Sequence, residues 1–330
     1  MKVNRTPHLI AVLAAIILSA VSICDAVGAE KIAVSMVGKN QAYLPVWVAQ
    51  QKGMFKEKGF DVETVSVRSV DVEAQALLSG SVQFSTMAAD GVIRLVEKGM
   101  DMKIVASINN AAGFSLVGRK EIKSLKDLKG TTLGVSGLAS GATVLMKEVL
   151  RANGLEFPRD YKMISVGSTQ ERMTALQAGA VSAVMLMVPT NYLAMDGGYP
   201  ELANIAQYIK EFQFTNVNTS GPWARANPGK VVDFLEAILR ANRWIHDNRK
   251  AAVEIAAKEI GIPVEHADRA YEFYITNKVQ PIDGSVPEKG VQKVIESLGE
   301  LDELKKPYPP ASKYIDMSYL KEAQKRVFGR

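Results

Sequence analysis

Hydroxyl and small residues gather in the middle of the chain, where Ser136, Ser140 and Gly141 follow the β-branched run 131–135. Apolar residues then recur at helical spacing until Gly154. The pattern predicts a strand, a small-residue loop and a helix. Free N–H groups at the start of such a helix, beside serine hydroxyls, can bind an anion or another polar group. A plain βα turn, whose glycines only relieve crowding, explains the same residues.

A polar loop also follows the first predicted strand, 32–37. Asn40 offers an amide that can donate and accept, and Tyr43 an aromatic wall with a polar tip. We predict that both line a ligand cleft. The alternative is that Asn40 only caps a helix and Tyr43 only packs. Trp47, one turn further along, is assigned to the core.

Arg68 ends the second predicted strand, 62–68. A guanidinium there could bind a carboxylate, sulfonate or phosphate through two parallel hydrogen bonds. The alternative is an arginine at the solvated rim, paired with Asp71 or Glu73. The ligand is expected to be anionic only if Arg68 faces inward.

Further candidates follow the other predicted strands. Ala88 and Ala89 would permit close backbone approach, while Asp90 either stabilises the first turn of a helix or faces the ligand. Ser168 begins another helix, which it could cap while touching the ligand. The remaining candidates for ligand contact are Asn109, Met187 and Asn191.

The elements that position these residues alternate regularly. The predicted strands are 32–37, 62–68, 82–87, 103–108, 131–135, 162–166 and 181–187, with helical stretches between them. Repeated βαβ order implies parallel sheets covered by helices, which bind ligands outside the carboxyl ends of their strands. After residue 223 the pattern becomes almost wholly helical.

About 300 residues exceed one ordinary core, so two domains are expected. Two half-sheets followed by a helical tail suggest that the tail packs back on the first half. We therefore predict a discontinuous first lobe, residues 30–115 and 219–330, and a second lobe, residues 116–218. The chain would cross between them at 113–118 and again at 215–222.

The first 29 residues have the pattern of a secretory signal peptide: a basic start, an apolar core and small residues near its end. Cleavage is expected after Ala29, which would place the protein in the periplasm. The alternative of a lipoprotein modified at Cys24 is less favoured, because Ile23 stands where a small residue is preferred. A membrane anchor is also less favoured, since the apolar core is shorter than the roughly 20 residues of a spanning helix.

Charge and composition narrow the classes of partner. The formal net charge of +5 is spread along the chain without a basic arm, so no nucleic-acid partner is expected. Hydrophobic residues make up 47% of a chain without low-complexity tracts, which indicates a globular protein throughout. No nucleotide-binding loop or metal-ligand spacing is present. We expect a monomer that binds a small molecule and needs neither cofactor nor metal.

Several short motifs together resemble a known superfamily. They are Tyr43-Leu44-Pro45, Lys52-Gly53-Met54-Phe55, Gly59-Phe60-Asp61-Val62-Glu63, Ala76 to Phe84, Leu125 to Gly130 and Ala175-Leu176-Gln177-Ala178-Gly179. In this order the chain resembles the periplasmic substrate-binding proteins of ABC importers for taurine, alkanesulfonates and nitrate, which are related to binders of thiamine-pyrimidine precursors. The resemblance implies an α/β, two-lobed periplasmic-binding-protein fold of type II, with two mostly parallel sheets and two hinge crossings. It also implies delivery of an anionic or heteroaromatic solute to an inner-membrane ABC permease.

Two other functions remain open beside transport. Some proteins of this fold are desulfinases or pyrimidine synthases, which depend on cysteine or on histidine and cysteine. Cleavage after Ala29 would remove Cys24, the single cysteine, and His246 and His266 fall in the helical tail. We therefore expect no enzyme activity. The sequence does not separate import from a sensor that reports ligand occupancy to a membrane receptor.

Overall fold

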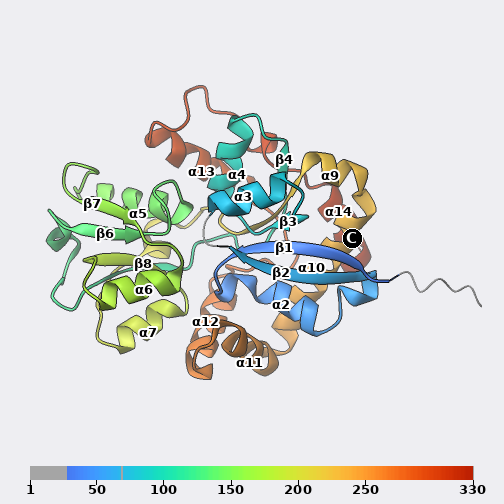
Figure 1. Ribbon diagram of the computed structural model, residues 1–330, viewed down its shortest axis with the longest axis horizontal. Coiled ribbons are helices and arrows are strands. Elements are labelled where there is room, and N and C mark those ends of the chain that lie inside the picture. Colours follow the sequence, from blue (N-terminus) through green and yellow to red (C-terminus); the bar gives the residue numbers. More distant parts are fainter. Residues whose placement is uncertain (1–27, 68–69, 330) are drawn as a thin grey trace, which may run out of the picture.

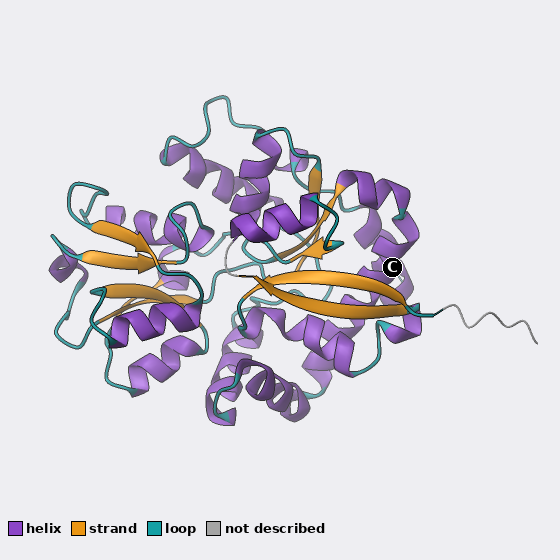
Figure 2. Cartoon of the chain, viewed as in Figure 1, coloured by secondary structure: helices purple, strands orange, loops and turns teal. Residues whose placement is uncertain are grey.

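The computed structural model describes residues 28–67 and 70–329, so most of the expected signal segment, Cys24 and Arg68 lie outside the described residues. Two α/β bodies face each other across a central division (Figure 1). Each is built on one five-stranded sheet with helices against it (Figure 2). We call the body containing β1 the first lobe and the body containing β6 the second lobe.

The sheet of the first lobe holds one strand that runs against the others. Its strands, in order across the sheet, are β2 (Phe60–Val67), β1 (Glu30–Val37), β3 (Phe84–Ser85), β10 (Asn216–Ser220) and β4 (Met102–Ser107). β1 pairs in parallel with β2 and β3, whereas β10 is antiparallel to both β3 and β4. β4 therefore runs in the same direction as the first three strands.

The sheet of the second lobe repeats this arrangement. Its strands, in order, are β7 (Lys162–Ser165), β6 (Thr132–Val135), β8 (Ala183–Met187), β5 (Phe114–Gly118) and β9 (Glu201–Asn204). β6 is parallel to β7 and β8, and β5 is antiparallel to β8 and β9. Both sheets are thus mixed but mostly parallel, which agrees with the fold class predicted from the sequence.

Helices cover the faces of both sheets (Figure 2). Those of the first lobe are α2 (Leu44–Gln51), α3 (Val70–Leu78), α4 (Ala89–Glu97), α9 (Gly221–Ala226), α10 (Pro228–Asp247), α11 (Arg249–Ile260), α12 (Val264–Thr276), α13 (Glu288–Glu300) and α14 (Ser318–Phe328). Those of the second lobe are α5 (Gly141–Ala152), α6 (Thr169–Gln177), α7 (Thr190–Asp196) and α8 (Ile205–Tyr208). None of the helices in the described part of the chain is long and apolar enough to cross a membrane.

The C-terminal helices are joined to the first lobe through a stack of aromatic rings. Phe234 of α10 stacks on Phe84 of β3 with ring centroids 3.9 Å apart, and on Phe55 at 5.0 Å. Trp223 meets Phe84 edge-on at 5.2 Å. Each such pair contributes about 0.5–1.5 kcal/mol beyond the apolar area it buries. Trp47, only 2% exposed, lies in the core as expected.

The chain changes lobe at two places that differ from the expected ones. It leaves the first sheet after β4 and returns to it at β10, so the connecting stretches are 108–113 and 209–215. The expected crossings at 113–118 and 215–222, and the expected boundaries after residues 115 and 218, fall on β5 and β10. Those two segments contain glycine or several polar residues, which resembles a connection. Their backbone groups are nevertheless paired within the sheets.

Candidate functional site

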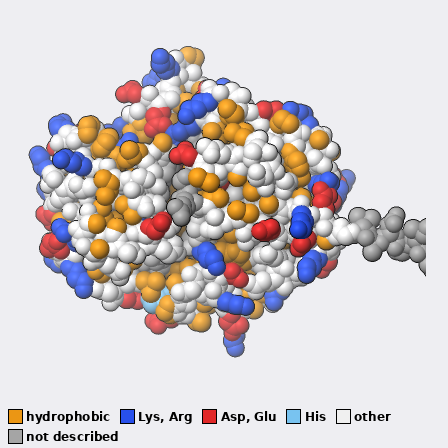
Figure 3. Space-filling view, in the orientation of Figure 1, with side chains coloured by type: hydrophobic (Ala, Val, Ile, Leu, Met, Phe, Trp, Pro, Cys, Tyr) orange, Lys and Arg blue, Asp and Glu red, His pale blue; other side chains and the backbone are white. Residues whose placement is uncertain are grey.

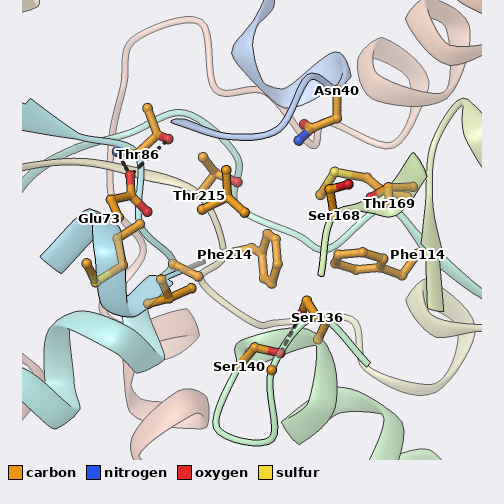
Figure 4. Close-up of a pocket in the computed structure, with 18 of the residues that line it drawn as sticks. Asn40, Glu73, Thr86, Phe114, Ser136, Ser140, Ser168, Thr169, Phe214 and Thr215 are labelled. Carbon is orange, nitrogen blue, oxygen red and sulfur yellow. Dashed lines mark hydrogen bonds between the residues drawn. The ribbon is translucent and has the colours of Figure 1, made fainter. Parts of the chain in front are cut away.

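A cavity of about 140 Å³ lies between the lobes, and both lobes contribute to its walls (Figure 4). One water needs about 10–15 Å³ on this scale, so the cavity has room for on the order of ten non-hydrogen atoms. Its lining includes Asn40, Tyr43, Glu73, Thr86 and Ala88 from the first lobe; Phe114, Ser136, Ser140, Gly141, Ser168, Thr169, Arg172 and Met187 from the second; and Phe214 and Thr215 from the return crossing.

Most of the residues expected at the cleft line this cavity. They are Asn40, Tyr43, Ala88, Ser136, Ser140, Gly141 and Met187. Ala89, Asn109 and Asn191 are not among the lining residues, and Arg68 lies outside the described residues.

The three expected residues that do not line the cavity have roles inside the lobes. The Ala89 amide donates to the Phe214 carbonyl at 3.1 Å. Asn191 is buried and donates its side-chain amide to Ser115 Oγ at 3.0 Å. Asn109 is also buried, and its carbonyl accepts from Gln213 Nε2 at 3.2 Å. Each follows or begins an element at the correct end of its sheet, but the direction of a side chain there is not fixed by the strand.

Asn40 combines the two roles that the sequence left as alternatives. Its Oδ1 accepts from the Ala42 amide at 2.9 Å and so caps a short 3₁₀ helix, Gln41–Tyr43. The same side chain lies on the cavity wall. Tyr43 packs edge-on against Trp47 with centroids 6.2 Å apart. Burial, together with the nearby Glu73 charge, raises the pKa of Tyr43 to about 12, so the phenol remains neutral.

Three hydroxyl groups form a directed chain at the start of α5. Thr143 Oγ1 donates to the Gly137 carbonyl at 2.7 Å, which uses its single proton. Ser140 Oγ, 3.0 Å from Thr143 Oγ1, must then donate to it, and Ser136 Oγ donates to Ser140 Oγ at 2.6 Å. Ser140 also caps α5 by accepting from the Thr143 amide at 3.3 Å. Ser136 is consequently left with acceptor lone pairs at the cavity.

Glu73 is a cavity residue that the sequence analysis named only as one possible partner of Arg68. It is completely buried, and its Oε1 accepts from the Thr86 amide at 2.8 Å and from Ser35 Oγ at 3.2 Å. Burial raises the pKa of its carboxyl to about 7. A usable signal existed in the sequence, because Val70, Glu73 and Leu77 recur at the spacing of one helix face.

Arg172 of α6 is the second charged group that sequence reasoning missed. It is 3% exposed, and its guanidinium donates to the Met185 carbonyl at 2.7 Å and to Thr169 Oγ1 at 3.1 Å. A further N–H group donates to the Gly167 carbonyl at 2.5 Å. Burial lowers the pKa of Arg172 to about 10, so it stays charged at neutral pH. These hydrogen bonds hold the segment before α6 against β8.

Asp90 is held by an ion pair within the first lobe. Its Oδ2 lies 2.5 Å from Arg94 Nη1, and Arg94 Nε lies 2.5 Å from Glu303 Oε2. Burial raises the pKa of Asp90, although the Arg94 charge acts in the opposite direction. The second oxygen, Oδ1, faces Gly141 of the other lobe. Asp90 therefore contributes to the contact between lobes and is not a lining residue of the cavity.

Polar contacts join the lobes on several sides of the cavity. Glu148 of α5 contacts Lys293 at 2.5 Å and Ser297 at 2.9 Å, both on α13. His266 of α12 lies 2.8 Å from Asp196 of α7. Gln170 Nε2 donates to the Lys39 carbonyl at 2.9 Å. With both lobes in contact around it, the cavity is in a closed arrangement.

Comparison with known proteins agrees with this architecture. A family model described as NMT1/THI5 like matches residues 40–252, which span strands of both sheets. The chain belongs to the NMT1/THI5-like family. YtlA of Bacillus subtilis strain 168, whose name describes a binding protein, is 23% identical to this NMT1/THI5-like chain over 234 residues, or 69% of this chain and 70% of its own.

Two further comparisons bear on the fold and on the family. The periplasmic nitrate-binding protein NrtA from Synechocystis PCC 6803 has a TM-score of 0.79 and 16% identity, with 92% of this chain and 90% of that chain covered. The fold is accordingly that of the periplasmic binding proteins. A Haemophilus influenzae relative, whose name refers to thiamine biosynthesis, is 25% identical over 259 residues, 74% of this chain and 79% of its own.

Proposed function

We propose that this protein is an extracytoplasmic solute-binding protein, which captures a small polar solute between its lobes and delivers it to an ABC permease in the inner membrane. The observation that carries the proposal is the cavity between the lobes, whose walls come from both of them. A solute held there contacts both lobes at once, so its binding favours the closed arrangement over the open one.

The architecture of the hinge supports a closing motion. The chain passes between lobes in the two stretches 108–113 and 209–215. Phe114, just after the first stretch, meets Phe214, near the end of the second, edge-on with centroids 5.2 Å apart. Both rings also line the cavity. Movement at the hinge is thereby coupled to the shape of the ligand pocket.

The chemistry of the lining suits a small ring or a compact polar solute. Tyr43, Phe114 and Phe214 supply aromatic walls, and Asn40 and Ser136 supply polar groups. A few fixed polar groups in a largely apolar pocket are typical of small-molecule sites. On the face shown in Figure 3, acidic and basic side chains are interspersed over the surface, which fits a protein that moves freely between solute and permease.

A thermal-shift screen tests the proposal. The panel contains sulfonates, carboxylates, nitrate, pyrimidines and flavins, and a solute that binds only the native state must raise the melting temperature. At about one hundred times Kd the stabilisation is about 2.7 kcal/mol, which is several degrees for a protein of this size. A hit should bind one-to-one by calorimetry and be lost in Ala88→Phe, which fills the cavity. No hit, or binding unchanged in Ala88→Phe, would contradict capture in this cavity.

A further inference from the structure

We infer that Glu73 selects solutes that present N–H donors, so that the ligand is an amidine-like or amino-substituted aromatic cation and not an anion. The inference rests on the proposed solute-binding function and narrows its ligand class. It starts from the position of one buried carboxylate oxygen at the wall of the cavity.

One carboxylate oxygen of Glu73 accepts hydrogen bonds from the protein, and the other accepts none from the described residues. Oε1 accepts from the Thr86 amide and from Ser35 Oγ, as the dashed lines at Thr86 illustrate in part (Figure 4). Oε2 is buried and has no hydrogen-bond partner among the described residues. An unpaired buried acceptor of this kind destabilises the protein, and more so when it is charged. A donor on a ligand would remove that cost.

Among the residues that the structure describes, the charged groups around Glu73 do not neutralise it. Tyr43 on the adjoining segment stays neutral and uses its hydroxyl on the Val37 backbone. Asp71, on the same helix, is exposed at the mouth of the cavity and has the same sign of charge. Arg172 stands in the opposite lobe, where its N–H groups serve Met185, Gly167 and Thr169. Within the described residues Glu73 forms no ion pair.

A second acceptor lies on the opposite wall. The hydroxyl chain that ends at Thr143 uses the Ser136 proton, so Ser136 faces the cavity as an acceptor. Acceptors on both lobes are complementary to a ligand with two or more N–H groups. Flat N–H donors attached to an aromatic ring would also use Tyr43, Phe114 and Phe214 as walls.

The competing arrangement is a protonated Glu73 that donates to an anion. The two arrangements move protons in opposite directions on binding. Because burial raises the pKa of Glu73 to about 7, the carboxyl is partly protonated near neutral pH. A cation would ionise Glu73 and release protons, whereas an anion would take protons up.

A matched set of ligands separates these cases. Benzamidine, benzamide, benzoate and benzenesulfonate have about the size of the cavity but differ in charge and donors. Calorimetry on the whole protein near pH 7, in two buffers of different ionisation enthalpy, should show that benzamidine binds at least about tenfold more tightly than benzoate, with proton release. Glu73→Gln should weaken benzamidine by about tenfold and abolish the release, while Asp61→Asn, at an exposed position of β2 outside the cavity lining, should change neither.

The results that would refute selection by Glu73 differ from those that would refute solute binding itself. Tighter binding of benzoate or benzenesulfonate, proton uptake, or unchanged benzamidine binding in Glu73→Gln would refute selection by Glu73 while confirming a solute site. No binding by any of the four would also refute it, and the wider thermal-shift screen would then decide the proposed function. If Glu73→Gln does not fold, the sign of the proton linkage in the natural protein still decides the question.

Discussion

Asp90 and Gly141 face each other across the division between the lobes so closely that a Cβ atom on Gly141 would lie 2.4 Å from Asp90 Oδ1. Asp90 has little freedom to move away, because Arg94 holds its other oxygen at 2.5 Å and its side chain is 2% exposed. Gly141 begins α5 and belongs to the second lobe, whereas Asp90 belongs to α4 of the first. The absence of a side chain at position 141 is therefore a requirement of the closed arrangement.

Gly141→Ala should weaken solute binding without destabilising the free protein. The added methyl group meets Asp90 only when the lobes are closed, and overpacking of this kind costs about 1–3 kcal/mol. We expect a loss of affinity of about tenfold or more for the best ligand, measured by calorimetry. The melting temperature of the ligand-free protein should stay the same or rise slightly, because alanine is the better helix former.

Gly229→Ala is the matched control for that experiment. It also lies in the first turn of a helix, α10, outside the cavity lining, and a Cβ atom there would meet nothing within 4 Å. Its affinity should stay close to that of the natural protein. Equal affinities for all three proteins would show that the contact between Asp90 and Gly141 does not limit closure.

The buried Glu73 makes the protein less stable as pH rises. Its pKa is raised from 4.5 to about 7 in the folded state, so between these values the folded protein keeps a proton that the unfolded chain loses. The contribution is fully present below the unfolded pKa and is lost as pH rises through the folded one. This shift of about 2.5 pKa units corresponds to about 3 kcal/mol.

Urea unfolding across this pH range measures the effect. The free energy of unfolding of the natural protein should fall relative to that of Glu73→Gln as pH increases, because glutamine does not titrate. The free energies of the two proteins are subtracted at each pH, because burial also raises the pKa of Asp90 and this contribution is common to both. Asp71→Asn serves as the control and should follow the natural protein. A constant difference between the natural protein and Glu73→Gln would refute the raised pKa.

Ser140 and Ser136 should separate stability from binding. Ser140 caps α5, so Ser140→Ala should cost about 1 kcal/mol and lower the melting temperature by a few degrees. Ser136 donates into the hydroxyl chain but caps nothing, so Ser136→Ala should leave the melting temperature nearly unchanged. Both variants should weaken the ligand, as thermal shift and calorimetry would show. Equal losses of stability in the two would contradict the assignment of the helix cap to Ser140 alone.

The sequence predicts where the strands end better than it predicts where the side chains beyond them point. The alternation of strands and helices located the carboxyl ends of the strands, so Asn40, Tyr43 and the segment around Ser140 were placed at the cavity. The direction of a side chain beyond a strand end depends on local backbone pairing, which is why the Asn191 side chain turns into its lobe and bonds to Ser115. Sequence patterns also do not show which residues far apart along the chain contact each other.

The positions of the hinge crossings were also hard to predict, because they depend on backbone pairing between distant segments. β5 and β10 are short segments that pair with strands far away in the chain, such as Ser115 with Asn204 and Asn218 with Ile104. Local composition made them look like connections, since β10 contains two asparagines. Glu73 was not among the expected cavity residues for a related reason, because local sequence does not show that the helix turns this carboxylate inward.

The ion pair between Glu148 and Lys293 should favour closure by a modest amount. It joins α5 to α13 at 2.5 Å, but the two side chains are 19% and 29% exposed, so solvent screens it. A pair of this kind is worth on the order of 1 kcal/mol or less, and Glu148 gains a further hydrogen bond from Ser297. Glu148→Gln should therefore reduce ligand affinity by about two- to fivefold, and raising the salt concentration should shrink the difference.

Arg249→Ala is the control, because its bonds to Asp268 and Glu272 remain within one lobe. Calorimetry at low and high salt would contradict the closure role if Glu148→Gln matched Arg249→Ala, since only a contact between lobes can change the balance between open and closed forms.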